Sequence, residues 1–212
     1  MNPYLKSVLT SAMLCFCTYA SAVEFMDYDY SRWSQEITGC DLLATHILDP
    51  GHVGDVGVES SNMDKDAAIA ACEIAVAKDP ENPRLNYQLG RAYGYSNRGE
   101  EAMPYRLKAV EKEYPQSLFV IGYLYLLGRT IEQDKCKTVE LWIKSAQYRR
   151  LAALVALPRH YMRGDFEGCG VNIPPDDLRA YLEEARATSG GDYYVNLLTE
   201  DLLREWEAKY PK

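Results

Sequence analysis

The segment that decides the fold is Leu89-Gly90-Arg91-Ala92-Tyr93, which recurs 32 residues later as Ile121-Gly122-Tyr123-Leu124-Tyr125. A second pair of segments, residues 125–128 and 161–164, shares the pattern Tyr-x-x-Gly at a spacing of 36 residues. Internal similarity at such a period is typical of proteins built from stacked helical hairpins. The sequence therefore predicts helical repeats from Asp66 onward.

The residue types at the repeated positions fit close helix packing. Gly90 and Gly122 fall in the middle of predicted helices, where glycine costs about 1 kcal/mol relative to alanine. Such glycines indicate a partner helix that approaches closely. Ala102 and Ala109 are seven residues apart on the following helix and therefore share one face. Pro115 marks a junction between two units.

The hydrophobic periodicity predicts nine helices, which we place in chain order. They cover residues 33–47, 65–78, 84–96, 100–113, 117–127, 135–148, 150–163, 175–188 and 191–208. One hairpin cannot bury its apolar face alone, so neighbours must stack. We expect an all-α, right-handed α-solenoid with a concave face.

The repeat residues resemble two known families of helical repeat. The unit with Leu89, Gly90, Tyr93, Ala102, Ala109 and Pro115 resembles a tetratricopeptide repeat. The next resembles a Sel1 repeat through Ile121, Gly122, Tyr125, Gly128, Asp134, Trp142, Lys144, Ser145 and Ala146. A third unit is degenerate, since Pro158 stands where a small residue is expected. A leading half-unit, with Ala68 and Ala75, fits only the second helix of a pair. The resemblance implies a non-enzymatic protein that binds other proteins.

The N-terminal residues 1–22 read as a secretory signal peptide. Lys6 gives a short positive region, an apolar run follows, and Ala20-Ser21-Ala22 is a cleavage pattern. An uncleaved anchor is the alternative. We expect a periplasmic or secreted product without stable membrane insertion, and the family resemblance implies a bacterial source. Residues 23–65 would form an N-terminal cap, 66–190 the repeats and 191–212 a C-terminal capping helix.

Four cysteines remain after residue 22: Cys40, Cys72, Cys136 and Cys169. An even number in an exported chain predicts disulfide bonds, for which three pairings are possible. We favour Cys40–Cys72 and Cys136–Cys169, which join neighbours and close loops of similar length. A zinc site is the alternative, but the chain has no C-x-x-C pair and its histidines are scattered.

Charge and motifs exclude several classes of function. The formal net charge is −8, which disfavours nucleic acid, because phosphate binding needs a basic patch. The histidines form no H-E-x-x-H pair, and the sequence contains neither a G-x-S-x-G elbow nor a glycine-rich phosphate loop. We expect no catalytic residue, no metal and no cofactor. The loop 49–55 is expected to be a flexible crossing, and the loop around Cys169 a constrained turn.

The concave face is the predicted binding site. The resemblance to these repeat families implies that the first helix of each pair lines the concave face. The residues that would then point into it are Arg84, Tyr87, Arg91, Phe119, Tyr123 and Arg159. Arginine and aromatic side chains are enriched at the centres of protein interfaces. The alternative is that the aromatic rings belong to the core and the arginines to the solvated surface. Tyr193 and Tyr194 are expected in the core or a cap.

Three functions follow as hypotheses. The first is an exported adaptor or scaffold that binds a protein or peptide partner, either basic or carboxylate-bearing. The second is a dedicated inhibitor, such as an immunity protein or a periplasmic repressor of a sensor kinase, since an acidic chain can cap a basic partner. The third is a cell-wall-acting enzyme, which ranks last because no pair of catalytic carboxylates is apparent.

Overall fold

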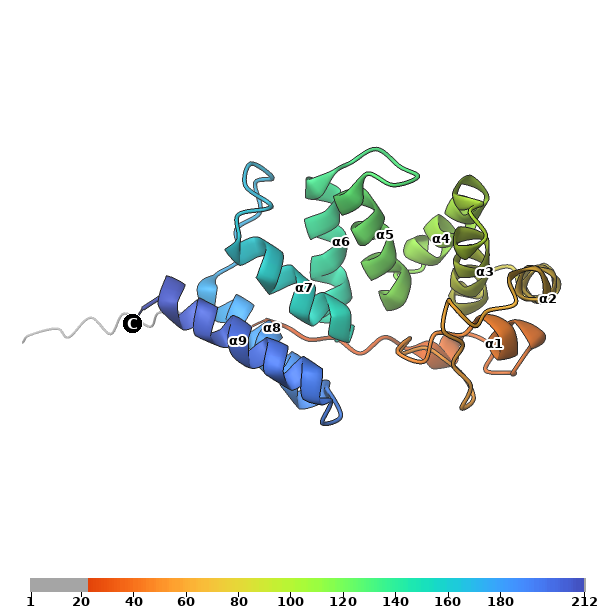
Figure 1. Cartoon of the computed structure of the whole chain (residues 1–212), viewed down its shortest axis with the longest axis horizontal. Coiled ribbons are helices and arrows are strands. Elements are labelled where there is room, and N and C mark those ends of the chain that lie inside the picture. The colour runs from red at the N-terminus through yellow and green to blue at the C-terminus, as the bar shows by residue number, and fades with distance from the viewer. Residues whose placement is uncertain (1–22, 212) are drawn as a thin grey trace, which may run out of the picture.

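The computed structural model describes residues 23–211, and within that range it contains helices and no strand (Figure 1). The predicted signal peptide lies outside the described residues. A 3-10 helix, η1 (Tyr30–Arg32), precedes nine α-helices. These are α1 (Gly39–Ala44), α2 (Lys65–Lys78), α3 (Pro83–Tyr95), α4 (Gly99–Glu111), α5 (Pro115–Leu127), α6 (Lys135–Gln147), α7 (Leu151–Met162), α8 (Pro175–Thr188) and α9 (Tyr193–Lys209).

Eight of the predicted helices lie within two residues of their expected ends, but the first was wrong. Instead of spanning residues 33–47, α1 has only six residues. Thr38 starts it with a reciprocal capping box, in which its hydroxyl accepts from the Asp41 amide and Asp41 accepts from the Thr38 amide. The chain turns extended again at Thr45. Local capping, rather than the long hydrophobic pattern, sets the length of this helix.

The helices pair into antiparallel hairpins, α1–α2, α3–α4, α5–α6 and α7–α8, followed by α9, and they stack into a right-handed α-solenoid (Figure 1). The close approach predicted at Gly122 is present, since an added Cβ would lie 2.6 Å from the ring of Trp142. Trp142 is fully buried and donates to the Phe119 carbonyl at 3.0 Å. Gly90 meets α4 in the same way, against Arg106 and the Ala102 carbonyl.

The incomplete leading repeat is completed by α1. It packs on both α2 and α3, in the place of the first helix of a pair. The chain then needs the long irregular loop 45–64 to reach α2. We call residues 45–62 the inner loop.

Both predicted disulfides are present. Cys40–Cys72 joins α1 to α2 with a Cα–Cα distance of 4.3 Å, and Cys136–Cys169 joins the start of α6 to the loop after α7 at 5.0 Å. Cys40 and Cys72 are fully buried, whereas Cys136 and Cys169 are partly exposed. The first bond holds a helix too short to persist alone in water.

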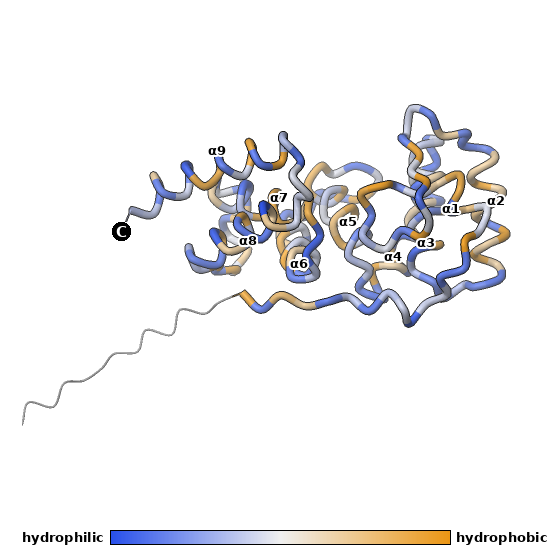
Figure 2. Tube along the Cα trace, turned by 90° about the horizontal axis from the view of Figure 1, so that it is seen from below, coloured by the Kyte–Doolittle hydropathy of each residue, from blue (hydrophilic) through white to orange (hydrophobic). Residues whose placement is uncertain are grey.

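Residues 23–37, which we call the N-terminal strap, run along the turns that connect one hairpin to the next (Figure 2). Met26 donates from its amide to the Gln147 carbonyl at 2.8 Å, and Tyr28 donates to the Lys112 carbonyl at 2.9 Å. At one end Phe25 packs edge-on against Tyr181 of α8, with ring centroids 5.9 Å apart. The strap therefore contacts the hairpins α3–α4, α5–α6 and α7–α8.

The last helix, α9, buries Leu202 and Trp206 against the preceding hairpin. Tyr193 and Tyr194 were expected in the core or a cap, but both are strongly exposed at the start of this helix. They precede the first buried position, Thr199, by more than one turn, so no neighbouring helix covers them. The C-terminal end of the solenoid thus leaves an apolar edge open to solvent.

Candidate interaction face

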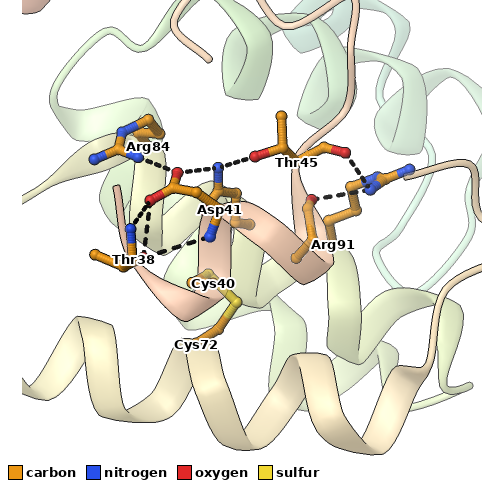
Figure 3. Close-up of a disulfide and its surroundings, with 9 residues drawn as sticks. Thr38, Cys40, Asp41, Thr45, Cys72, Arg84 and Arg91 are labelled. Carbon is orange, nitrogen blue, oxygen red and sulfur yellow. Dashed lines mark hydrogen bonds and ion pairs between the residues drawn. A yellow bond between two sulfur atoms is a disulfide. The ribbon is translucent and has the colours of Figure 1, made fainter. Parts of the chain in front are cut away.

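We call the surface lined by α3, α5, α7 and α9 the inner face. Its α3 portion is covered by α1, by the strap and by the inner loop. Arg84, Tyr87 and Arg91, three of the six predicted site residues, are each 3 % exposed. Arg84 forms an ion pair with Asp41 of α1 (Figure 3). It also donates to the strap carbonyls of Ser34 and Glu36. These side chains are part of the protein interior and are closed to a partner.

Arg91 shows how the inner loop closes this portion of the face. Its guanidinium donates to the main-chain carbonyls of Ala44 and Thr45 at 2.9 and 3.2 Å, of which Figure 3 shows the contact with Thr45. It also donates to the Val58 carbonyl at 2.6 Å. These contacts hold both ends of the inner loop on α3. A buried arginine is tolerated when its donors are satisfied, and carbonyl groups satisfy them here.

Farther along the face, the tip of the inner loop enters a buried polar cluster. Asp49 is fully enclosed and accepts from the Tyr114 hydroxyl at 2.8 Å and from the Gly51 amide at 3.0 Å. Burial raises the pKa of Asp49, and the two hydrogen bonds oppose that rise. Tyr87 lies beside the same cluster, where burial and then the charge of Asp49 raise its pKa to about 12.

The loop 49–55 was expected to be a flexible crossing, but its first residues are fixed. Gly51 packs so tightly against Tyr30 and Tyr114 that an added Cβ would lie 2.4 Å from the Tyr114 hydroxyl. Asp49 and Gly51 are therefore structural residues that anchor the inner loop.

Beyond this point the inner face is open. Phe119 and Arg159 are partly exposed, and the exposed fraction of Tyr123 is 46 %. Next to Arg159, a cavity of about 300 Å³ is lined mainly by apolar side chains from α7, from the start of α9 and from the inner loop. Its lining comprises Leu48, Arg150, Leu151, Ala152, Val155, Ala156, Arg159, His160, Val195 and Leu198. The structure separates the six predicted residues into a closed group on α3 and an open group on α5 and α7.

Sequence reasoning missed Arg150, Leu48 and Leu198 as lining residues. Arg150 precedes the first turn of α7, and the helical spacing that selected Arg159 does not extend to it. Leu48 belongs to an irregular loop without periodicity. Only Leu198 carried a usable signal, as an apolar residue at helical spacing from Leu202 on the last helix.

The described part of the chain lacks two other kinds of feature, a cluster of metal ligands and a membrane-spanning helix. Within residues 23–211, no three histidine, cysteine, aspartate or glutamate side chains are grouped so that they could hold a metal ion. Over the same residues, no helix combines the length and apolar character needed to cross a membrane.

Comparison with known proteins places the fold. No protein-family model matches the chain, and no curated protein matches it. Among solved structures, it is similar to a Sel1 repeat protein from Oxalobacter formigenes, with a TM-score of 0.51 and 20 % sequence identity over 66 % of this chain. The match spans only 39 % of that protein. The chain thus has a Sel1-like helical-repeat fold.

Proposed function

We propose that this chain is an exported, non-catalytic module that binds a protein partner on the open part of its inner face. The observation that carries the proposal is the contrast along that face. The α3 portion is filled by the inner loop, whereas the α5–α7–α9 portion exposes Tyr123 and leaves an apolar cavity of about 300 Å³. Apolar, aromatic and arginine side chains around a concave site are the composition of interface hot spots.

Export is supported by two features of the sequence and structure. The predicted signal peptide precedes the fold, and two disulfides hold it together. Structural disulfides persist in oxidising compartments such as the bacterial periplasm.

The test is capture of a partner from an envelope extract by residues 23–212. Leu198→Asp, on the cavity, is compared with Leu107→Asp on the outer helix α4, because the two leucines are 37 % and 39 % exposed. We expect Leu198→Asp and Tyr123→Ala to lose the partner and Leu107→Asp to keep it, with all variants melting within a few degrees of the parent. Capture that is unaffected by Leu198→Asp but lost in Ile74→Asp would move the site to the outer face of α2 and contradict the proposal.

An inhibitor would use the same face. The effect of deleting the gene distinguishes an inhibitor from an adaptor. An inhibitor must bind a single toxin or sensor and suppress its activity. Deletion of the gene would then release that activity, whereas loss of an adaptor would disperse a complex without releasing an activity.

A further inference from the structure

The N-terminal end of the stack carries a cavity that the proposed interaction face does not include. It has a volume of about 390 Å³ and lies between residues 34–39 and the helices α2 and α3, and we call it the end groove. Ile37 and Ile74, which belong to its lining, are 52 % and 60 % exposed. The rest of its apolar lining comprises Ala71, Ala75 and Leu85. The end groove therefore holds apolar surface that the chain itself leaves uncovered.

The walls of the end groove are fixed by contacts that are already present. The disulfide Cys40–Cys72 ties α1 to α2. In the other wall, the buried guanidinium of Arg84 donates to the carbonyls of Ser34 and Glu36 at 3.0 and 3.3 Å. A site whose walls are already ordered does not have to lose chain entropy when it is filled, so even a small contact can be made there.

The polar groups of the end groove fit an aromatic ring that carries a hydroxyl. Glu36 and Asp79 bring carboxylates to its lining. The side chain of Glu36 is exposed and has no hydrogen-bond or ion-pair partner among the described residues. An apolar cavity with a carboxylate at its edge suits a tyrosine, since the hydroxyl can donate there while the ring is buried. The same pairing occurs inside this chain, between Tyr93 and Glu73, Tyr114 and Asp49, and Tyr148 and Glu113.

The last helix displays two tyrosines of the kind that such a groove would hold. Tyr193 and Tyr194 are 70 % and 78 % exposed, and their ring centroids lie 5.5 Å apart. Within residues 23–211, neither hydroxyl has a hydrogen-bond partner. Asp192 caps α9 by accepting from the Val195 amide at 2.9 Å, so both tyrosines stand on the first turn of a regular helix. Exposed tyrosines on a rigid element are frequent anchors of protein interfaces.

The end groove and the tyrosine pair belong to opposite ends of the stack. Figure 1 shows α2 at one end of the molecule and α9 at the other, so one copy cannot bring them together. Solenoids require terminal repeats with polar outer faces to stay apart in solution. Here the first and the last elements both expose apolar side chains. A patch and a pocket on different parts of one molecule form a heterologous contact, which adds copies head to tail.

We propose that this protein associates with itself head to tail, with Tyr193 and Tyr194 of one copy in the end groove of the next. This contact goes beyond the proposed function and uses residues outside the cavity beside Arg159. Two tyrosine side chains bury about 300–500 Å² in all, less than the about 800 Å² per partner of a stable interface, so the association is weak. Because two different surfaces meet, each copy keeps one free end, and the assembly does not stop at a dimer.

Sedimentation equilibrium of residues 23–212, without any other protein, tests the proposal. Over about 10 to 500 μM, where a small interface associates, we expect the weight-average mass to rise above that of a dimer. Ile74→Asp in the groove should keep the chain monomeric, and so should the double variant Tyr193→Ser/Tyr194→Ser. Leu107→Asp, on an exposed position of α4, should assemble as the parent does. Circular dichroism and thermal melting establish that all variants are folded.

A mixture of the two defective variants gives the sharpest result. The Ile74→Asp chain keeps its tyrosines, and the Tyr193→Ser/Tyr194→Ser chain keeps its groove. An equal mixture should therefore form a dimer and no larger species, although each variant alone is a monomer. An isologous contact between two α9 helices would behave differently, because it would give a parent dimer that survives Ile74→Asp.

Three results would overturn the proposal. They are a parent that stays monomeric over the whole range, an association that survives Ile74→Asp, and a mixture of the defective variants that is no heavier than its components. The proposed function is measured separately, through capture of a partner and its loss in Leu198→Asp. Failure of self-association would thus leave that function standing, and failure of capture would leave self-association standing.

Discussion

Arg84 of α3 donates to the carboxylate of Asp41 of α1 where both side chains are almost completely buried. The same carboxylate also accepts from Gln88 at 2.9 Å and from the Thr38 amide at 2.8 Å (Figure 3). One acidic group thus caps α1, fixes α1 on α3 and neutralises a buried cation.

Removing one member of this pair should therefore be costly. We expect Arg84→Met to lower the free energy of unfolding by about 3–5 kcal/mol, because it leaves a buried carboxylate without its counter-charge. Asp41→Leu should lose a similar amount plus the cap of α1. Urea unfolding of both single variants and of the double variant measures the coupling. A double variant whose loss equals the sum of the single losses would show that the pair does not act as a unit.

The two disulfides should differ in their response to reductant. Their cysteines are separated by nearly the same number of residues, 32 and 33. In the chain-entropy model each disulfide therefore stabilises the folded protein by about 3–4 kcal/mol. Access differs, because Cys136 and Cys169 are partly exposed while Cys40 and Cys72 are fully buried. We expect dithiothreitol to reduce Cys136–Cys169 first in the folded protein. Alkylation at timed intervals, followed by mass spectrometry, measures the order in which the two disulfides are reduced. Simultaneous labelling of all four thiols would contradict the expected order.

The glycine that lets α5 approach α6 should not tolerate a methyl group. Gly122→Ala gains about 1 kcal/mol in helix propensity but places a Cβ 2.6 Å from the buried Trp142 ring. Overpacking of this kind costs about 1–3 kcal/mol. We expect a net loss of stability and a shifted Trp142 fluorescence. Gly39→Ala is the control, because its Cβ would meet Ala71 at 3.4 Å, an ordinary contact, and thermal melting should show little change.

The turn between α4 and α5 should contribute stability that depends on pH. Hydrogen bonds from Lys144 and then Tyr148 lower the pKa of Glu113 below its ordinary value of 4.5. A lowered folded-state pKa stabilises the protein above about 4.5, and the contribution is lost as the pH falls through the folded value. Glu113→Gln should therefore lose about 0.2–1 kcal/mol at pH 7, the range of partly exposed pairs, and nothing near pH 2. Melts from pH 2 to 8 test this, and a loss that is as large at pH 2 as at pH 7 would contradict it.

The sequence predicted the helical repeats well, but it did not predict which part of their inner face is covered by the rest of the chain. The difference has a physical reason. Gly122 and Trp142 indicate the contact between α5 and α6 in the sequence, because close helix packing requires particular side chains at a fixed spacing. The hydrogen bonds of Arg91, in contrast, go to carbonyl groups of the inner loop, which every residue type possesses. The residues that close the α3 portion therefore left no signal in the pattern. The sequence pattern marks Arg91 as a helix residue, but the loop carbonyls that cover its side chain could not be predicted.

The strap of residues 23–37 also affects the order in which the chain can fold. Repeats in a solenoid touch only their neighbours, so they can form one after another as the chain emerges. Met26 and Phe25 are synthesised early, whereas their partners Gln147 and Tyr181 are synthesised more than 100 residues later. Contacts at such sequence separation slow the final step of folding. In the growing chain the first hairpins can already stack, while the strap lacks its last contacts until the α7–α8 hairpin has been made.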